Sequence, residues 1–243
     1  MTQGFYEITY NEKIAKNVYK MVLSGDTSAI TAPGQFVNLK LEGKFLRRPI
    51  SICDWNEETI TLIYKVVGEG TEQMSQMTVG QTVDVLVGLG NGYTTSKSGD
   101  KPLLIGGGVG VPPLYGLAKK LISEGKSVSV VLGFNTADEI FLKEEFEALG
   151  AEVTVATADG SVGIKGFVTD AIKEMEYSYF FTCGPEPMFR AIEKTVTTGG
   201  QYSFEERMGC GFGACMGCTC KTKYGNKRIC KDGPVLEREE IVW

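Results

Sequence analysis

Histidine is absent from the 243 residues of the chain. Without an imidazole, the chain can form no histidine-ligated zinc or haem site, no Rieske-type iron–sulfur site, and no nucleophile activated by a histidine base. Hydride transfer and single-electron transfer do not depend on such a side chain, because a bound cofactor supplies the reactivity. The absence of histidine therefore favours redox chemistry.

Long apolar runs and clusters of basic residues are missing as well. No apolar segment approaches the roughly 18 residues of a membrane-spanning helix, and Met1–Ile8 lacks the basic and apolar regions of a signal peptide. The formal net charge of −5 argues against nucleic acid as a partner. We therefore expect a cytoplasmic protein without membrane or nucleic-acid partners. The chain has seven cysteines, and in such a reducing compartment we expect clustered thiols to bind metal rather than oxidise.

Glycine, by contrast, is abundant, with 31 of 243 residues, against the roughly 7% usual in proteins. Because glycine has no side chain, it lets the backbone approach a ligand closely, and this abundance suggests more than one ligand. The hydrophobic content of 42% and the charged content of 23% are typical of a soluble globular protein. The length predicts two domains and a small appendage.

Four of the seven cysteines lie within eleven residues near the C-terminus. Cys210, Cys215 and Cys218 have the spacing C-x4-C-x2-C of a plant-type 2Fe–2S cluster, which needs one more thiolate. Glycines among these cysteines allow backbone N–H groups to point at the sulfurs. A structural zinc site or a set of disulfides is the alternative, although zinc sites usually pair C-x2-4-C units. The fourth ligand is either Cys220 or Cys230.

The first 98 residues contain short segments rich in alternating or β-branched apolar side chains, which predict a small antiparallel barrel. These segments are 5–10, 17–23, 35–41, 51–54, 59–67 and 82–86. Two polar clusters interrupt them. In Arg47–Ile52, the arginines are suited to bind a phosphate and the serine to bind a ring nitrogen. The turn Gly68–Thr71 opens a helix at 72–77, with Thr71 as the expected N-cap. Each cluster alone also fits a solvated surface or a simple helix cap.

Strands and helices alternate from residue 99 to residue 203, which predicts a parallel sheet covered on both faces. The strands are expected at 101–105, 127–132, 152–156 and 179–182, and the helices at 114–124, 142–149, 168–174 and 186–197. The glycine-rich turn 106–113 suits a dinucleotide pyrophosphate at a helix N-terminus, although a tight turn without a ligand is the alternative. The acidic segment 133–139 contains no cation, which favours NAD over NADP.

Together these motifs resemble the ferredoxin–NADP reductase superfamily. Arg48-Pro49-Ile50-Ser51 is similar to its flavin-binding R-x-[YF]-S element, and Cys183 lies in a Cys-Gly-Pro element similar to the one that closes the nicotinamide pocket. Ile50 replaces the usual aromatic residue, so an aliphatic face or Tyr64 is expected to pack on the flavin. Cys53 is expected to be a buried core residue.

The resemblance implies an FAD-binding barrel (1–98), an NAD-binding α/β domain (99–203) and a 2Fe–2S subdomain (204–243). It implies catalytic roles for Cys183 and Ser51. The cofactor-binding residues that it implies are Arg48, Pro49, Ile50, Ser51, Ile63, Tyr64, Lys65, Gly70, Thr71, Gly106, Gly107, Gly108, Gly110, Cys183 and Gly184.

The order of barrel, nicotinamide domain and cluster resembles the electron-transfer subunits of NAD-dependent (type B) dihydroorotate dehydrogenases. This resemblance implies that an FMN-containing catalytic subunit oxidises dihydroorotate in pyrimidine (UMP) biosynthesis. Electrons then pass through the 2Fe–2S cluster and FAD to NAD⁺, within a heterotetramer of two copies of each subunit. The C-x-D-G-P pattern of this family matches Cys230, which implies that Cys230 is the fourth ligand. Phe212, Ala214 and Met216 would then face a protein partner.

Two alternatives remain open from the sequence. Small subunits of ferredoxin–NAD(P) oxidoreductases or sulfide dehydrogenases are built from the same modules. A non-catalytic NAD-sensing or zinc-stabilised interaction module is the other alternative, and a visible spectrum distinguishes it from a coloured flavin and iron–sulfur protein.

Overall fold

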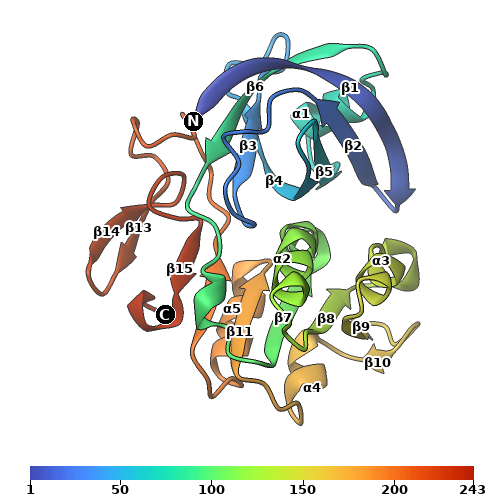
Figure 1. The fold of residues 1–243 in the computed structure, drawn as a ribbon, viewed down its shortest axis with the longest axis vertical. Helices are drawn as coiled ribbons and strands as arrows, with labels where there is room; N and C mark the ends of the chain where they lie inside the picture. The colour runs from blue at the N-terminus through green and yellow to red at the C-terminus, as the bar shows by residue number, and fades with distance from the viewer.

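The computed structural model describes residues 1–243, and its N-terminal strands close into an antiparallel barrel in the order β1-β2-β5-β4-β3-β6 (Figure 1). The strands are β1 (Thr2–Ala15), β2 (Val18–Ser24), β3 (Phe36–Leu39), β4 (Arg48–Trp55), β5 (Thr59–Lys65) and β6 (Thr82–Leu89). A short helix, α1 (Glu69–Ser75), connects β5 to β6. Side chains alternate along each strand. In β3, Val37 and Leu39 pack in the barrel interior, whereas Phe36 packs on the outside against the C-terminal segment.

The second part of the chain forms a seven-stranded sheet in the order β10-β9-β8-β7-β11-β12-β15, in which only β15 is antiparallel to its neighbour. Its first six strands along the chain are β7 (Pro102–Gly107), β8 (Ser129–Phe134), β9 (Glu152–Thr157), β10 (Ile164–Lys165), β11 (Tyr179–Cys183) and β12 (Gly200–Ser203). The helices are α2 (Pro112–Ser123), α3 (Lys143–Ala148), α4 (Val168–Ile172) and α5 (Glu186–Glu193). Short 3-10 helices are η1 (Thr95–Lys97), η2 (Gly108–Gly110) and η3 (Ala137–Glu139).

Helices cover both faces of this sheet, as expected for buried parallel strands. Leu104 of β7 belongs to the core cluster that contains residues of α2 and α3. Its neighbours Leu103 and Ile105 belong to the cluster that contains residues of α4 and α5. No helix is long and apolar enough to cross a bilayer.

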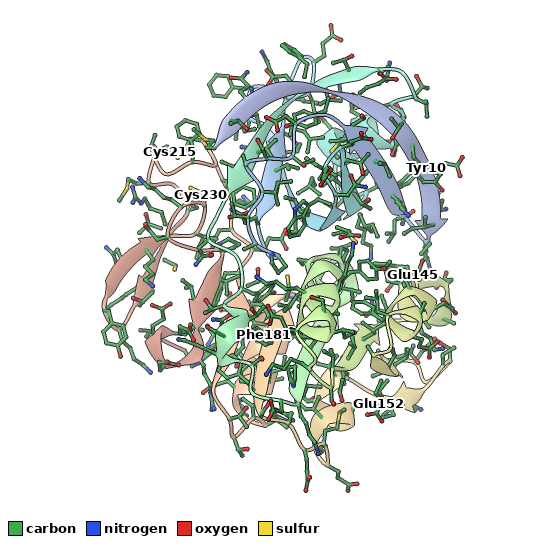
Figure 2. The ribbon with its side chains drawn as sticks, viewed as in Figure 1. Tyr10, Glu145, Glu152, Phe181, Cys215 and Cys230 are labelled. Atoms are coloured by element: carbon green, nitrogen blue, oxygen red, sulfur yellow. The ribbon has the colours of Figure 1, made fainter.

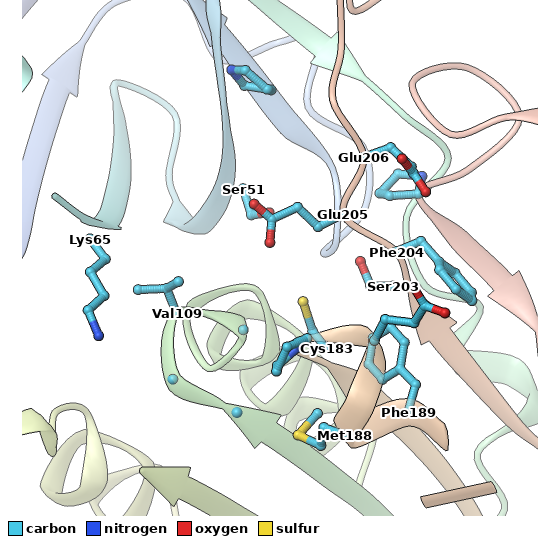
Figure 3. A pocket seen from close by; sticks show the side chains of 18 of the residues that line it. Ser51, Lys65, Val109, Cys183, Met188, Phe189, Ser203, Phe204, Glu205 and Glu206 are labelled. Atoms are coloured by element: carbon cyan, nitrogen blue, oxygen red, sulfur yellow. The ribbon is translucent and has the colours of Figure 1, made fainter. Parts of the chain in front are cut away.

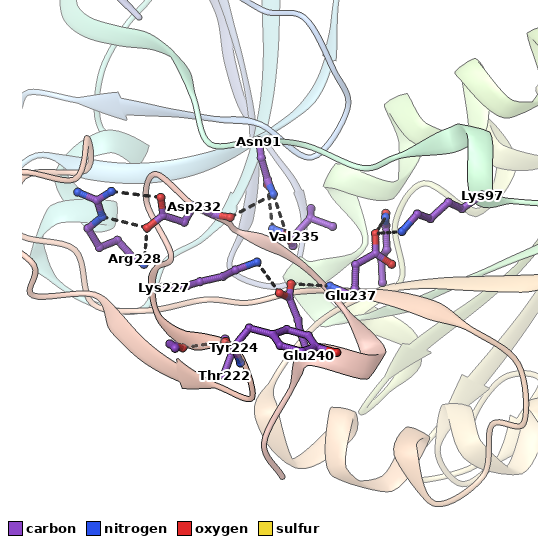
Figure 4. Close-up of polar contacts among 12 residues, drawn as sticks. Asn91, Lys97, Thr222, Tyr224, Lys227, Arg228, Asp232, Val235, Glu237 and Glu240 are labelled. Atoms are coloured by element: carbon purple, nitrogen blue, oxygen red, sulfur yellow. Dashed lines mark hydrogen bonds and ion pairs between the residues drawn. The ribbon is translucent and has the colours of Figure 1, made fainter.

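The C-terminal segment contacts both preceding parts. It contains the hairpin β13 (Thr219–Thr222) and β14 (Gly225–Arg228), the strand β15 (Val235–Glu237) and the 3-10 helix η4 (Arg238–Glu240). Strand β15 extends the edge of the α/β sheet by pairing with β12. Asn91, just after the barrel, donates from Nδ2 to the carbonyl of Val235 at 2.8 Å and accepts from its N–H at 3.1 Å (Figure 4). The cluster segment is therefore held against the junction of the two larger parts.

The fold class expected from the sequence is confirmed by the barrel, the parallel sheet and the separate C-terminal segment. Some element bounds differ. Strand β1 continues to Ala15, and α5 ends at Glu193 rather than near residue 197. The short strands β10, β12 and β15 were not expected, because each has only two to four residues. Strands this short leave too few positions for a period-2 pattern to be recognised.

Candidate functional site

A cleft of about 1900 Å³ lies where the barrel, the α/β part and the C-terminal segment meet (Figure 3). All cofactor-binding residues expected from the sequence line it, except Gly70 and Gly106. Gly106 is buried behind the cleft, where an added Cβ would lie 2.8 Å from Val111. Its lack of a side chain serves strand–helix packing, whereas Gly107, Gly108 and Gly110 face the cleft. The expectation that Gly106 contacts a ligand is not supported by this position.

The two neighbouring arginines of the barrel have different surroundings. Arg47 donates from Nη2 to both carboxylate oxygens of Asp84, at 2.9 and 3.0 Å, and is therefore held within the barrel wall. Both arginines line the cleft, but Arg48 forms no such ion pair and donates only to the backbone carbonyl of Leu46. It lies across Gly70, where an added Cβ would come within 2.1 Å of Arg48 Nε. Gly70 therefore contributes by leaving room for the Arg48 guanidinium, which remains available for an anion.

Thr71 does not occupy the N-cap of α1, contrary to the sequence expectation. The N-cap is Gly68, and Thr71 is the third helical residue. Its hydroxyl oxygen accepts hydrogen bonds from the N–H groups of Val67 at 2.9 Å and Gly68 at 3.3 Å. The helix begins earlier than expected because this side chain reaches back to the turn, as in a capping box. Thr71 thus fixes the turn that faces Arg48.

Tyr64 is not placed to replace the missing aromatic residue of the R-x-[YF]-S element. It is only 2% exposed, its hydroxyl donates to Oδ1 of Asn11 at 3.0 Å, and its ring stacks on Tyr19. The ring therefore belongs to the barrel wall, and burial raises the pKa of the Tyr64 hydroxyl. Ile50 is half-buried and lines the cleft, so an aliphatic surface takes the aromatic position.

Cys183 lies at the end of β11, beside the glycine-rich turn. An added Cβ at Gly110 would come within 2.2 Å of the Cys183 carbonyl oxygen, so only glycine allows this approach. Burial raises the pKa of the Cys183 thiol to about 12, and the charge of Glu205 acts in the same direction. The thiol is consequently neutral near pH 7. It can pack or donate weakly, but it is not a thiolate nucleophile.

Ser203 and Glu205 belong to the same part of the cleft, although sequence reasoning did not select them. Figure 3 shows both side chains around the space that Ser51 and Cys183 also face. Ser203 ends the four-residue strand β12, and Glu205 follows two residues later. Recognising β12 would have provided the signal, since functional residues of open parallel sheets gather at the carboxyl ends of the strands.

An ion pair crosses the cleft from the barrel to the α/β part. Lys65 at the end of β5 lies 3.1 Å from Glu139, which also accepts hydrogen bonds from the backbone and side chain of Asn135. Glu139 follows β8, the second strand of the α/β part, where dinucleotide-binding folds hold the adenosine ribose. A carboxylate there suits ribose hydroxyls and disfavours a 2′-phosphate, in agreement with the expected preference for NAD.

The loop that contains the candidate cluster ligands directs N–H groups at cysteine sulfurs. Sγ of Cys210 accepts from the N–H groups of Ala214 at 3.2 Å and Cys215 at 3.4 Å. Sγ of Cys218 accepts from the N–H of Cys230 at 3.4 Å. Although burial opposes it, hydrogen bonds from the backbone lower the pKa of the Cys210 thiol to about 6. The backbone contacts to Cys210 stabilise its thiolate, the form that ligates iron.

The backbone of this loop also fits a cluster. Gly211 and Gly213 have φ angles of +80° and +92°, which disfavour any other residue. An added Cβ at Gly209 would lie only 3.1 Å from Sγ of Cys215. The glycines thus keep the surroundings of the sulfurs free of side chains. A disulfide alternative is not supported, because all seven cysteines are free.

Cys220 differs from the other cysteines of the segment. Its side chain lines the large cleft, whereas Cys210, Cys215, Cys218 and Cys230 do not. In the hairpin it is paired with Lys227 of β14. Cys53 is 2% exposed within β4, as expected for a core residue.

Two family models match the chain. The iron–sulfur cluster binding domain of dihydroorotate dehydrogenase B matches residues 205–242, and an oxidoreductase NAD-binding domain matches residues 104–194. The chain is 44% identical to the dihydroorotate dehydrogenase B (NAD(+)) electron transfer subunit of Geobacillus sp., over 100% of this chain and 99% of the relative. It is 45% identical to the subunit of that name from Fusobacterium nucleatum, over 95% of each chain.

Solved structures share the fold of this chain. A chain from the NADH-dependent reduced ferredoxin-NADP oxidoreductase, reported for flavin-based electron bifurcation, aligns with a TM-score of 0.89 and 32% identity over 98% of this chain and 90% of that chain. Flavohemoglobin from Malassezia yamatoensis aligns with a TM-score of 0.69 and 20% identity over 80% of this chain and 56% of that chain, which indicates a shared fold. From these full-length similarities and the cysteine loop, the chain belongs to the family of dihydroorotate dehydrogenase B (NAD(+)) electron transfer subunits.

Proposed function

We propose that this chain passes electrons from a partner catalytic subunit, which oxidises dihydroorotate, to NAD⁺ in pyrimidine biosynthesis. The observation that carries the proposal is the single cleft that joins the Arg48 wall of the barrel, the glycine turn before α2 and the segment leading to the cysteine loop. Bound FAD can exchange an electron pair with nicotinamide and single electrons with a 2Fe–2S cluster, so it links the two kinds of chemistry.

The barrel side of the cleft would hold FAD. The Arg48 guanidinium would bind its pyrophosphate by paired hydrogen bonds, and Thr71 would keep the adjacent turn in place. Ile50, Ile63 and Ser51 would flank the flavin ring. These assignments are supported by the absence of a carboxylate partner for Arg48 and by the position of all these residues on one wall.

The α/β side would hold NAD⁺. Its pyrophosphate would bind beside the start of α2, at Gly107, Gly108 and Gly110. The nicotinamide would be placed next to the flavin by Cys183 and Gly184. The neutral Cys183 thiol adds no charge to the space where the hydride moves.

The C-terminal segment would hold the cluster through Cys210, Cys215, Cys218 and Cys230. This choice is supported by the N–H groups aimed at Cys210 and Cys218, and by the location of Cys220 on the cleft. The three functional units would be residues 1–98, 99–203 and 204–243, with β15 of the third unit completing the sheet of the second.

The partner would be an FMN-containing subunit, in a cytoplasmic heterotetramer with two copies of each chain. Phe212 and Met216 are 42% and 54% exposed beside the cysteines, which supports a contact at this loop. Contact here would bring the partner's cofactor near the cluster rather than near NAD⁺.

Co-expression with the catalytic subunit of the same genome tests the function. The purified complex should show flavin and iron–sulfur absorbance and form NADH when dihydroorotate is added. The catalytic subunit alone should not reduce NAD⁺. A coloured complex that binds dihydroorotate yet leaves NAD⁺ unreduced would contradict the proposal.

A second function is favoured by the full-length similarity to the ferredoxin-NADP oxidoreductase chain. In that case this chain would accept electrons within a complex that acts on ferredoxin and NADP. Purification of the native complex distinguishes the two, since the partner would carry either FMN alone or additional 4Fe–4S clusters.

A further inference from the structure

Asn38 lies at the contact between the flavin-binding barrel and the cysteine loop. It is 1% exposed, and its register partner in β4 is Pro49, between the cleft residues Arg48 and Ile50. Because side chains alternate along β3, Asn38 points to the outside of the barrel, on the same side as Phe36. That outer side is covered by the segment that carries the cysteines.

The Asn38 side chain makes one polar contact, and it is with the candidate cluster ligand Cys210. Nδ2 of Asn38 donates to the carbonyl oxygen of Cys210 at 3.3 Å. Gly211 makes this approach possible, since an added Cβ there would lie 2.3 Å from Nδ2. Apolar packing at this contact includes Phe36, Cys218 and Cys230, which belong to one buried cluster.

The other end of the amide is unsatisfied. Oδ1 of Asn38 is the only buried side-chain oxygen or nitrogen in residues 1–243 without a hydrogen-bond partner. An apolar residue of the same shape would avoid this cost, so packing does not explain an asparagine here. The backbone around it is rigid, because Arg47 donates to the carbonyls of both Asn38 and Asp84.

We propose that Asn38 is a positioning residue, which fixes the Cys210 side of the cluster loop against the strand pair that holds the flavin. It would thereby set the position of the cluster relative to FAD and the electrostatic surroundings of the cluster. This inference rests on the proposed function. It adds a residue that contacts neither nicotinamide nor iron and acts through the backbone of Cys210.

Two substitutions test the role in the purified full chain. Asn38→Leu keeps the volume and removes the donor. Asn38→Asp replaces the amide by a carboxyl group, which adds a negative charge and removes the donor when it is ionised, so the potential is measured from pH 6 to pH 9. We expect both to alter the electron paramagnetic resonance (EPR) spectrum of the reduced cluster. We expect Asn38→Asp to lower the midpoint potential enough to shift the electron equilibrium with FAD at least tenfold, which is about 59 mV for one electron.

Asn11→Leu is the matched control. Asn11 also donates from Nδ2 to backbone carbonyls, those of Met74 at 2.8 Å and Met77 at 2.9 Å. Its neighbour Tyr10 lies on the side of the molecule opposite Cys215 and Cys230 (Figure 2). We expect this variant to lose stability without any change in cluster spectrum or potential. Iron and flavin contents are measured for every variant.

Loss of iron from both Asn38 variants, with FAD retained and Asn11→Leu fully loaded, would also support the proposal. Unchanged spectra and potentials in loaded Asn38 variants would overturn it, as would an equal change in Asn11→Leu. A wild-type chain that binds neither FAD nor a cluster would instead contradict the proposed function itself.

Discussion

At the scale of single residues, the site depends on which polar groups are already satisfied by the protein. Arg47 and Arg48 are adjacent and chemically identical, yet only Arg47 has a carboxylate partner. The resemblance to the R-x-[YF]-S element selected Arg48, but the partner of Arg47 could not be predicted, because Asp84 comes from a distant strand. Their difference leads to a direct prediction about flavin binding.

Arg48→Ala should weaken FAD binding by roughly 10- to 100-fold, because a charged hydrogen bond to phosphate contributes about 1.5–3 kcal/mol. Fluorescence titration of the flavin-free chain with FAD measures this change. Arg47→Ala is the control, and it should mainly lower the unfolding free energy because it leaves the Asp84 carboxylate without its partner. Equal losses of FAD affinity in the two variants would contradict the distinction.

The pKa of Cys183 predicts a dependence of stability on pH. Burial raises this pKa from 9.0 to about 12, so between these values the folded chain keeps a proton that the unfolded chain loses. The unfolding free energy should therefore be unaffected by this group below pH 9 and should fall as the pH rises from 9 to 12. Cys183→Ala should make that decline shallower, as measured by urea unfolding at pH 8 and pH 10.5. Parallel declines in both proteins would show that the thiol is not buried.

At the scale of elements, sequence patterns predicted the barrel strands and the strand–helix alternation well. Long stretches of one periodicity are informative, and helix α2 is an example. Short strands are not, and β12 and β15 were missed for this reason. Because β12 was not predicted, Ser203 and Glu205 were not predicted as site residues either, since their positions depend on that strand.

The glycine motifs were located correctly, but their individual roles could not be read from spacing. Gly70 makes room for a guanidinium, and Gly106 makes room for a helix. Gly211 makes room for an amide from the barrel. For Gly70 and Gly211 the neighbouring group comes from a distant part of the chain, and an isolated sequence does not identify it.

Strand β15 and Asn91 connect the cluster segment to the rest of the molecule, which makes Asn91 a test of that connection. Asn91→Ala removes two hydrogen bonds to Val235 and should destabilise the segment by roughly 1–3 kcal/mol. Iron should be lost to a chelator faster than from wild type, whereas FAD content should remain unchanged. Hydrogen exchange should increase in residues 233–243. Coupled loss of FAD and iron would argue that the segment does not open separately.

At the scale of the whole molecule, three lysine–carboxylate pairs join the barrel to the α/β part. They are Lys16–Asp138, Lys65–Glu139 and Lys119–Asp54, at 3.0, 3.1 and 2.9 Å. Such partly exposed pairs contribute little stability individually. They link the barrel to the α/β part, and Lys65–Glu139 does so within the cleft.

The exposed loop predicts where the partner binds. Phe212→Glu together with Met216→Glu should prevent assembly with the catalytic subunit, because a charge would be buried in an apolar contact. NADH should still reduce the flavin of this variant at the wild-type rate. Size-exclusion chromatography of the mixed subunits measures assembly. Tyr224 is exposed on the hairpin turn, and the assembly of a Tyr224→Glu variant indicates whether the contact with the catalytic subunit extends to that turn. Normal assembly of the double variant would place the partner elsewhere.

The central claim is that an iron–sulfur cluster in this chain delivers electrons to NAD⁺ through a flavin in the shared cleft. The most direct test is to reduce the purified chain anaerobically, remove the reductant and mix the chain with NAD⁺. The account predicts that the EPR signal of the reduced cluster decays as NADH absorbance appears. Because reduced FAD by itself supplies the two electrons of one NADH, the account also predicts more than one NADH per FAD with excess NAD⁺, and at most one NADH per FAD with the cluster still reduced would contradict it.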